Sequence, residues 1–250
     1  MIGPFFLYLY HVRFIINLHA GNYFKDKTNI TVAMKTINLG EKNSIFNHFI
    51  REIRDISIQN DSMRFRRNIE RIGEIFAYEI SKKMEFNNRE ITTPLGISSE
   101  SLIDDKPVLA TILRAGLPLH QGFLNYFDSS DNCFISAYRK HKRGGNFEVK
   151  IEYMSSPDLD GKTVILCDPM LASGSSMILA IKALLSKGKP KHIHIVAVIA
   201  SAEGVDYVKE NIPIKECTLW LGALDQEMTA QSYIVPGLGD AGDLAYGQKV

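Results

Sequence analysis

The chain has 250 residues, 45% of them hydrophobic, so it can bury a substantial core within one large domain. Its 29 Lys and Arg residues balance 28 Asp and Glu residues, which excludes a global attraction to nucleic acid or to an anionic membrane. The three cysteines, Cys133, Cys167 and Cys217, lie far apart in or beside apolar runs. Neither a disulfide framework nor a cysteine metal site is indicated, and we expect a reducing cytoplasmic location.

The first 33 residues differ in character from the rest of the chain. The run Ile2–Leu18 is strongly apolar, but His11 and Arg13 interrupt it, and neither a basic amino end nor a cleavage site of small residues accompanies it. We therefore expect residues 1–33 to be an upstream extension or a divergent appendage, and residues 34–250 to form a single functional domain. An intact mass from the native cell that retains Met1 would contradict this expectation.

An α-helical layer is predicted at the start of this domain. Apolar residues recur at spacings of three or four, which is typical of an amphipathic helix with one buried face: Phe65, Ile69, Ile72, Phe76 and Ile80. Ser62 is the expected N-cap of this helix. Residues 41–58 show a weaker helical pattern, and residues 60–62 separate the two helices.

After Pro107, short aliphatic runs alternate with segments of helical length. We predict strands over residues 108–113, 134–138, 162–167, 193–200 and 218–221. The nearly continuous apolar runs at residues 164–166 and 195–200 favour strands covered on both faces, as in a parallel sheet. Residues 176–185 have helical spacing and end shortly before Gly188. The order of elements predicts a doubly wound α/β domain with a mostly parallel sheet.

A flexible β-hairpin arm is predicted to project from this core. Gly144 and Gly145 precede alternating apolar residues, namely Phe147, Val149, Ile151 and Tyr153. The basic residues Lys140–Arg143 belong to this hairpin, together with the two glycines. We expect the arm to close over a substrate and exclude water.

Three polar turns follow predicted strands, where ligands bind in an open α/β sheet. Leu113 leads into Arg114–Gly116, Tyr138 into Arg139, and Cys167 into Asp168. All three turns are expected on one side of the sheet.

The turn that begins at Asp168 is the most informative. It places a carboxylate after a strand and small residues before a helix, in the order Asp168, Pro169, Met170, Leu171, Ala172, Ser173, Gly174, Ser175 and Ser176. Backbone amides, hydroxyls and the helix N-terminus can converge there on a phosphate, while the carboxylate suits sugar hydroxyls or a metal. The alternative is an ordinary strand-to-helix turn with Ser as a helix cap.

This segment resembles the phosphoribosyl pyrophosphate loop of the uracil phosphoribosyltransferases, in which Asp-Pro-Met-Leu-Ala precedes Thr-Gly-Gly-Ser. Ser173 stands here for the usual Thr, and Ser175 stands for the usual second Gly, which accepts a wider range of backbone angles. Four more segments resemble the family in the same order: Ile112–Leu117, Tyr138–Arg139, Asp225–Gln226 and Tyr233–Asp243. We call the last two segments the hood, after the part of the family that covers uracil.

The resemblance implies a type I phosphoribosyltransferase fold and transfer of 5-phosphoribosyl from its pyrophosphate to uracil, giving UMP and pyrophosphate. It also implies site roles. Arg114 and Arg139 would bind pyrophosphate, residues 168–176 the rest of the donor, with Asp168 on the ribose hydroxyls, and Asp240 the pyrophosphate through Mg²⁺. The four charged residues are the expected catalytic residues. The ion would be carried by the substrate and would not be held directly by the protein.

Uracil contacts are implied for the hood residues Ile234, Gly239, Asp240 and Ala241. Residues 237–242 also match Gly-x-Gly-x-x-Gly, but only eight residues follow Gly242, which leaves no room for a dinucleotide-binding unit. A tight turn whose backbone groups hydrogen-bond a flat base is the better interpretation.

Two other functions stay open: transfer to a different base, or a regulatory protein that senses nucleotides without catalysis. The sequence after Arg139 departs from the Asn-Glu-Glu that is common in the family, which keeps the second alternative alive. The resemblance further implies a homodimer or larger homo-oligomer and allows a purine nucleotide effector, whereas no nucleic-acid or membrane partner is expected.

His192 and His194 share one face of a predicted strand. No third ligand is evident in the sequence, so we expect a role at the edge of the sheet and no metal site.

Overall fold

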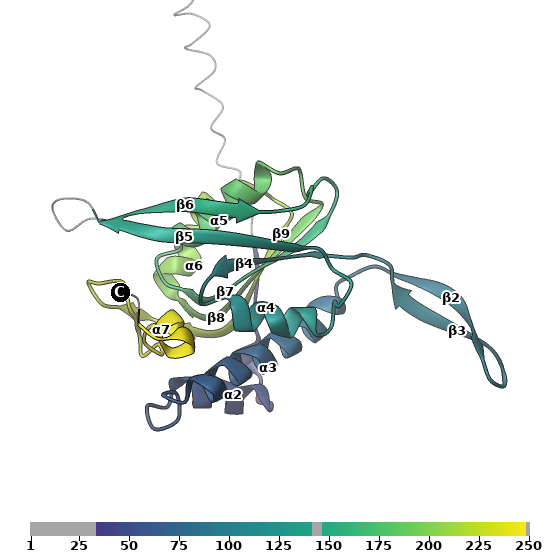
Figure 1. Ribbon diagram of the computed structural model, residues 1–250, viewed down its shortest axis with the longest axis horizontal. Helices are drawn as coiled ribbons and strands as arrows, with labels where there is room; N and C mark the ends of the chain where they lie inside the picture. Colours follow the sequence, from purple (N-terminus) through teal and green to yellow (C-terminus); the bar gives the residue numbers. More distant parts are fainter. Residues whose placement is uncertain (1–33, 142–146, 249–250) are drawn as a thin grey trace, which may run out of the picture. The chain divides into compact units, whose positions relative to one another are not determined.

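The computed structural model describes residues 34–141 and 147–248, and of residues 137–141 and 147–150 it describes the backbone alone. The expected extension, residues 1–33, lies outside this part. A seven-stranded sheet forms the centre, in the order β1-β9-β8-β7-β4-β5-β6 (Figure 1). Its strands are β1 (Lys35–Asn38), β4 (Val108–Leu113), β5 (Asn132–His141), β6 (Phe147–Ser155), β7 (Thr163–Leu171), β8 (His192–Ser201) and β9 (Cys217–Asp225).

All neighbouring strands of this sheet pair in parallel except β6, which runs antiparallel to β5. The chain continues from β4 to β5 on one side, and β7 lies on the other side of β4. The order of strands therefore reverses between β4 and β7, and such a switch point is where α/β sheets bind ligands.

Helices cover both faces of the sheet, so the predicted doubly wound α/β fold is confirmed. One face packs against α2 (Phe46–Arg54), α3 (Ser62–Ser81), α4 (Leu117–Leu124) and α7 (Ala241–Tyr246), and the other against α5 (Ser175–Leu185) and α6 (Ala202–Asn211). The alternation of side chains along β7 explains the two cores. Val164 and Leu166 pack with α5, whereas Ile165 and Cys167 pack on the side of α3.

The amino-terminal helical layer is present, with two differences in detail. The N-cap of α3 is Asp61 and not Ser62, because the Asp61 carboxylate accepts a 3.0 Å hydrogen bond from the Arg64 amide. The preceding helix is shorter than predicted and ends at Arg54. Asp55 leaves the helical conformation, and its carboxylate accepts a hydrogen bond from the Ser57 amide in a local turn.

Two hairpins extend from this framework. The pairing of β5 with β6 confirms the predicted arm, whose turn residues 142–146 lie outside the described part. A second hairpin, β2 (Phe86–Thr93) and β3 (Gly96–Ile103), was not predicted, and Figure 1 shows it reaching away from the central sheet. Its tip exposes two apolar side chains, Leu95 and Ile97.

After β9 the chain forms the short antiparallel pair β10 (Glu227–Met228) and β11 (Ile234–Val235), and then α7. A 3-10 turn, Leu39–Glu41, follows β1 near the start of the domain. Within residues 34–141 and 147–248, every helix is too short or too polar to cross a membrane.

Candidate active site

The three predicted polar segments follow neighbouring strands, because β5 and β7 flank β4 on its two sides. Arg139 itself lies within β5 and not in a turn as predicted, because pairing with β6 extends β5 to His141. Thr111 of β4 is paired with Cys167 of β7, and Leu113 with Ser136 of β5. The carboxyl ends of the parallel strands therefore bring the turn after Leu113, the Asp168 segment and the end of β5 together.

Gly116 allows the first turn to lie against β7. A methyl group at this position would lie 2.1 Å from Thr111 Oγ1 and 3.2 Å from the Cys167 carbonyl oxygen, so no larger residue fits without a shift. The close approach places Arg114 beside the strand that carries Asp168.

Strand β7 continues three residues beyond Asp168, so this carboxylate does not stand at the end of the strand as predicted. The extension occurs because β8 supplies partners, with Met170 opposite Ile199 and Leu171 opposite Ala200. Pro169 and Leu171 are buried, and Leu171 packs in the core beside α5. The side chains of both residues support the loop from the core, so mainly their backbone atoms can contact a ligand.

The remaining phosphate-type loop, residues 172–174, is held on α6. Gly174 has the left-handed φ of 76°, and a methyl group there would lie 2.9 Å from the Tyr207 ring and 3.0 Å from the Gly204 carbonyl oxygen. Ser201 Oγ donates a 2.7 Å hydrogen bond to the Ala172 carbonyl and accepts one of 2.8 Å from the Gly204 amide. The loop is therefore shaped by residues that lie about one α/β unit further along the chain, such as Ser201, 29 positions after Ala172.

Ser175, which stands for the usual second Gly of the family, fits this geometry. It is the first residue of α5, and the left-handed conformation falls on Gly174. Among the described non-glycine residues only Ser232 has a positive φ, so Ser175 carries no such conflict. Ser173 Oγ donates a 3.2 Å hydrogen bond to Ser175 Oγ, and both hydroxyls lie at the N-terminus of α5 with Ser176.

The Asp168 carboxylate is half-buried, and its Oδ1 accepts a 3.2 Å hydrogen bond from the Met170 amide. The adjacent Cys167 thiol is fully enclosed, and burial raises its pKa to about 12. This thiol stays protonated at neutral pH and is therefore no nucleophile.

Arg114 joins the first turn to the carboxyl-terminal segment. Its Nη2 donates to Asp243 Oδ1 at 3.2 Å and to the Gly247 carbonyl at 3.0 Å. Its Nε is buried and lacks a hydrogen-bond partner in the described part of the chain, so this donor can serve an anionic ligand. Arg139 lies opposite Val149 in β5, but its side chain falls outside the described residues.

The hood is anchored by two residues that the sequence did not reveal. Arg54 makes two 2.8 Å hydrogen bonds to the Asp225 carboxylate and a 3.0 Å bond to the Gly237 carbonyl. The Gly237 amide in turn donates to Asp225 at 2.9 Å. Gln59 Nε2 donates to the Leu238 carbonyl at 3.2 Å. No local motif surrounds Arg54 or Gln59, so only the tertiary contact identifies them.

Two of the four residues that were predicted to contact uracil are buried, and two are exposed. Ile234 and Ala241 are 4% and 3% exposed, so their side chains form the base of the hood, whereas Gly239 and Asp240 face solvent. Asp240 has a structural task as well, because its Oδ1 caps α7 by accepting from the Gly242 amide at 2.8 Å and the Asp243 amide at 3.0 Å.

A phosphate-type loop and an Arg-bearing turn beside the switch point of a parallel sheet place the chain in the class of α/β proteins that bind phosphorylated ligands. Residues 41–248 match the family model described as uracil phosphoribosyltransferase. A relative of that name from Porphyromonas gingivalis is 59% identical over 217 residues, which cover 87% of this chain and all of the relative.

A second relative of the same name, from Methanococcus vannielii, is 37% identical over 77% of this chain and 82% of its own. The solved structure of the AQ2163 protein from Aquifex aeolicus superposes with a TM-score of 0.75 at 28% identity, over 86% of this chain and 99% of that one. The chain belongs to the uracil phosphoribosyltransferase family. The predicted family and the predicted pentosyltransferase activity are confirmed.

Proposed function

We propose that this chain transfers the 5-phosphoribosyl group of phosphoribosyl pyrophosphate to N1 of uracil, giving UMP and pyrophosphate. The observation that carries the proposal is the contact between Arg114 and Asp243, which brings the hood against the first turn of the donor site. In this proposal the first turn and the base-covering hood form two walls of one site.

The donor would be held by its phosphates and its ribose. The amides and hydroxyls at the start of α5, including Ser173 and Ser175, suit the 5-phosphate, and Asp168 suits the ribose hydroxyls. Arg114, with a buried Nε that has no partner in residues 34–141 and 147–248, suits the pyrophosphate. We assign the same substrate group to Arg139 from its place at the end of β5.

The reaction needs no covalent nucleophile. As ribose separates from pyrophosphate, positive charge develops on the sugar, so the protein's task is to hold both reactants in line and to stabilise the leaving group. Arg114 and Arg139 act on the pyrophosphate oxygens, and closure of the β5–β6 arm excludes water.

Uracil is recognised in this proposal by fixed backbone groups of the hood. Gly237 is fixed because its amide donates to Asp225 and its carbonyl accepts from Arg54, and Gly239 has a φ of 92° that favours glycine. A dione that alternates carbonyl acceptors with N–H donors can match fixed amides and carbonyls, and a wrong base leaves some of them unpaired. Ile234 and Ala241 support this turn from below.

Mg²⁺ fits as an ion carried by the substrate. Asp240 Oδ1 accepts from two amides, whereas Oδ2 accepts from no residue in the described ranges. These ranges also contain no group of three or more His, Cys, Asp or Glu side chains that would cage an ion. When bound, the ion neutralises pyrophosphate charge. Asp240 would contact it without forming a dedicated site.

Four further expectations remain proposals. The apolar side chains Leu95 and Ile97 on the β2–β3 hairpin support a homodimer or larger homo-oligomer, because 100% and 72% of their surface is exposed. A purine nucleotide effector and a cytoplasmic location follow from the family resemblance and the cysteine content. A domain limited to residues 34–250 predicts that removal of residues 1–33 leaves turnover unchanged.

The proposal is tested by incubating the purified chain with phosphoribosyl pyrophosphate, Mg²⁺ and one base at a time, and following nucleotide formation. Uracil should give UMP, while cytosine, hypoxanthine, guanine and orotate should react far more slowly. Faster reaction with another base would establish the transferase alternative. Tight donor binding without any product would establish the nucleotide-sensing alternative.

A further inference from the structure

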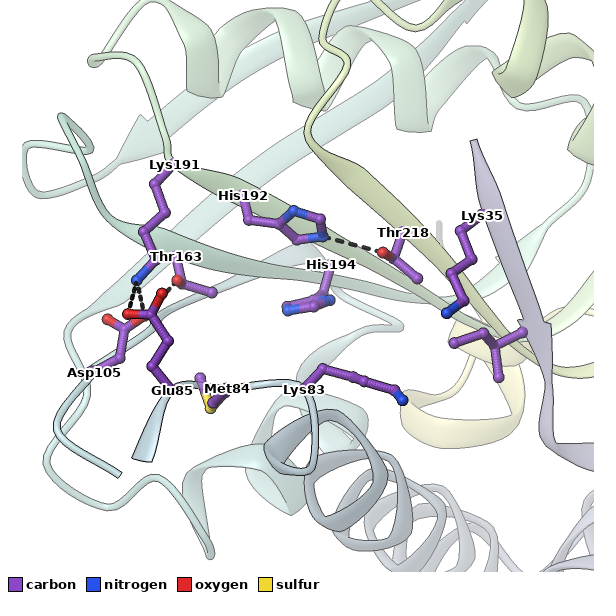
Figure 2. A pocket seen from close by; sticks show the side chains of 11 residues that line it. Lys35, Lys83, Met84, Glu85, Asp105, Thr163, Lys191, His192, His194 and Thr218 are labelled. Carbon is purple, nitrogen blue, oxygen red and sulfur yellow. Dashed lines mark hydrogen bonds and ion pairs between the residues drawn. The ribbon is translucent and has the colours of Figure 1, made fainter. Parts of the chain in front are cut away.

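A second cavity lies at the opposite edge of the sheet from the candidate active site. It has a volume of about 390 Å³ and lies where strands β1, β7, β8 and β9 begin, closed on one side by the segment that follows α3 (Figure 2). Cavities of this size hold small ligands. The first residues of three strands line it, namely Lys35, Thr163 and His192.

His194 presents a fixed hydrogen-bond donor to this cavity. Trp220 Nε1 can only donate, and it lies 3.2 Å from His194 Nδ1, so Nδ1 is the acceptor and the neutral ring carries its proton on Nε2. The residue is 5% exposed and lines the cavity. Burial lowers the pKa of His194 to about 3, so the ring is neutral at physiological pH.

No protein acceptor satisfies this donor in the part of the chain that the structure describes. The neighbouring ring of His192 is 4.5 Å away by centroid, and its Nε2 is engaged with Thr218 Oγ1 at 3.1 Å. Because no described residue accepts from this N–H group, an acceptor from outside the chain can take the hydrogen bond.

The charges around the cavity are unbalanced. Asp105 is held by Thr163 Oγ1 at 2.5 Å and by Lys191 Nζ at 3.1 Å, and Lys191 also lies 3.4 Å from Glu85. Lys35 and Lys83 form no ion pair with any described residue. In Figure 2 the His194 ring lies between the Asp105–Glu85–Lys191 group and these two lysines.

We propose that this cavity binds an oxyanion, a phosphate or carboxylate group of a small ligand, between His194 and the ammonium groups of Lys35 and Lys83. Lys191 offsets one of the two carboxylates, and with Lys35 and Lys83 the lining has three ammonium groups against two carboxylates, a net charge of +1 that favours an anionic group. A neutral imidazole donor and two ammonium groups together match the several acceptor oxygens of an oxyanion. The site is independent of the proposed transferase reaction.

Trp220 makes the proposal measurable, because it is the single tryptophan of the chain and is hydrogen-bonded to His194. The full chain is titrated with inorganic phosphate in one arm and with citrate in another, at constant ionic strength, while Trp220 fluorescence is recorded. We expect a saturable change in at least one arm, and the arm that responds identifies the oxyanion.

The double substitution Lys35→Gln with Lys83→Gln should raise the midpoint of the titration at least about fivefold, since two charge-assisted contacts are lost. Lys82→Gln is the matched control, because Lys82 adjoins Lys83 but pairs with Glu79 outside the cavity. It should leave the midpoint unchanged. All three lysines are exposed, so the variants should fold like the parent.

A further variant, Arg114→Gln, separates this site from the donor site, which also binds phosphate in the proposed function. The midpoint should be unaffected by Arg114→Gln. Absence of a saturable change in both arms, an unaltered midpoint in the double variant, or loss of the signal in Arg114→Gln would overturn the proposal.

Discussion

Arg54 of α2 and Asp225 at the end of β9 form a two-bond ion pair, with both N···O distances 2.8 Å, across 171 positions of the chain. Asp225 is 7% exposed, and the same two side chains hold the carbonyl and the amide of Gly237. A helix from the start of the domain thus fixes the turn that is proposed to select the base. Arg54 is a positioning residue in this account.

Arg54→Lys should weaken uracil binding more than donor binding, because an ammonium group cannot reproduce the planar two-bond contact. We expect the KM for uracil to rise about tenfold, corresponding to roughly 1.4 kcal/mol, while the KM for phosphoribosyl pyrophosphate changes little. Steady-state kinetics with each substrate varied in turn measures both constants. Arg51→Lys is the control, since Arg51 forms an exposed pair with Asp55 on the same helix. Equal rises in both KM values would show a merely structural role for Arg54.

Gly174→Ala should damage the donor loop. The left-handed φ of 76° disfavours alanine, and the added methyl group would press on the Tyr207 ring and the Gly204 carbonyl. We expect a loss of about 1–3 kcal/mol in unfolding free energy and a raised KM for phosphoribosyl pyrophosphate. Gly161→Ala is the control, because Gly161 also has a left-handed φ, of 67°, but has open space around it. This variant therefore measures the cost of the backbone conformation without the steric contact. If both variants bind the donor equally well, the packing of Gly174 has no role in the loop.

Ser201→Ala tests the support of the loop from behind. It leaves the Ala172 carbonyl without this donor and the Gly204 amide without this acceptor. A rise of about fivefold in the KM for phosphoribosyl pyrophosphate is expected, since a lost hydrogen bond of this kind costs on the order of 1 kcal/mol. Ser186→Ala provides the comparison, because Ser186 Oγ makes a similar 2.6 Å bond to the Ala183 carbonyl at the far end of α5. An unchanged KM in Ser201→Ala would show that this contact with α6 does not support donor binding by the loop.

The buried imidazole of His194 should make the protein sensitive to acid. Its pKa falls from the ordinary 6.5 to about 3 on folding, so below pH 6.5 the unfolded chain binds a proton that the folded chain does not. Stability is therefore retained above pH 6.5 and lost as the pH falls toward 3, by about 2 kcal/mol at pH 5. His194→Gln keeps an acceptor for Trp220 and should lose less stability between pH 7 and pH 5. The unfolding free energy of both proteins is measured at pH 7 and pH 5 by chemical unfolding, followed by Trp220 fluorescence. An equal loss of stability in the parent and in His194→Gln would contradict the role of His194.

Local patterns were sufficient for most of the central sheet and for helices α3 and α5, whereas the edge strand β1 and the helices α4, α6 and α7 were not predicted. The apolar runs of β4, β7 and β8 are long enough to be covered on both faces, and the spacing of Ile69, Ile72 and Phe76 matches one face of α3. The β2–β3 hairpin was missed because its strands are polar and mostly exposed, so no buried face leaves a periodic signal. Asp61 was passed over as a cap in favour of its neighbour, an error of one residue.

The parts of the candidate site that lie in one sequence motif could be predicted. The residues that join the site from distant parts of the chain could not. Asp168 and Gly174 belong to one motif, whereas Ser201, Arg54 and Gln59 reach the loop and the hood only through the fold. The length of β7 was underestimated because pairing with β8 decides where the strand ends. Such contacts depend on tertiary neighbours that no local window contains.

The most direct measurement is the rate of UMP formation from uracil and phosphoribosyl pyrophosphate by the parent chain and by Asp168→Asn, together with the unfolding free energy of each. Asparagine keeps the shape of the side chain and an oxygen that can accept from the Met170 amide, but it removes the carboxylate charge offered to the ribose. The account predicts rapid UMP formation by the parent and a loss of at least about a hundredfold in turnover in the variant, with little change in stability. A parent chain that makes no UMP, or a variant with unchanged kinetics, would contradict it.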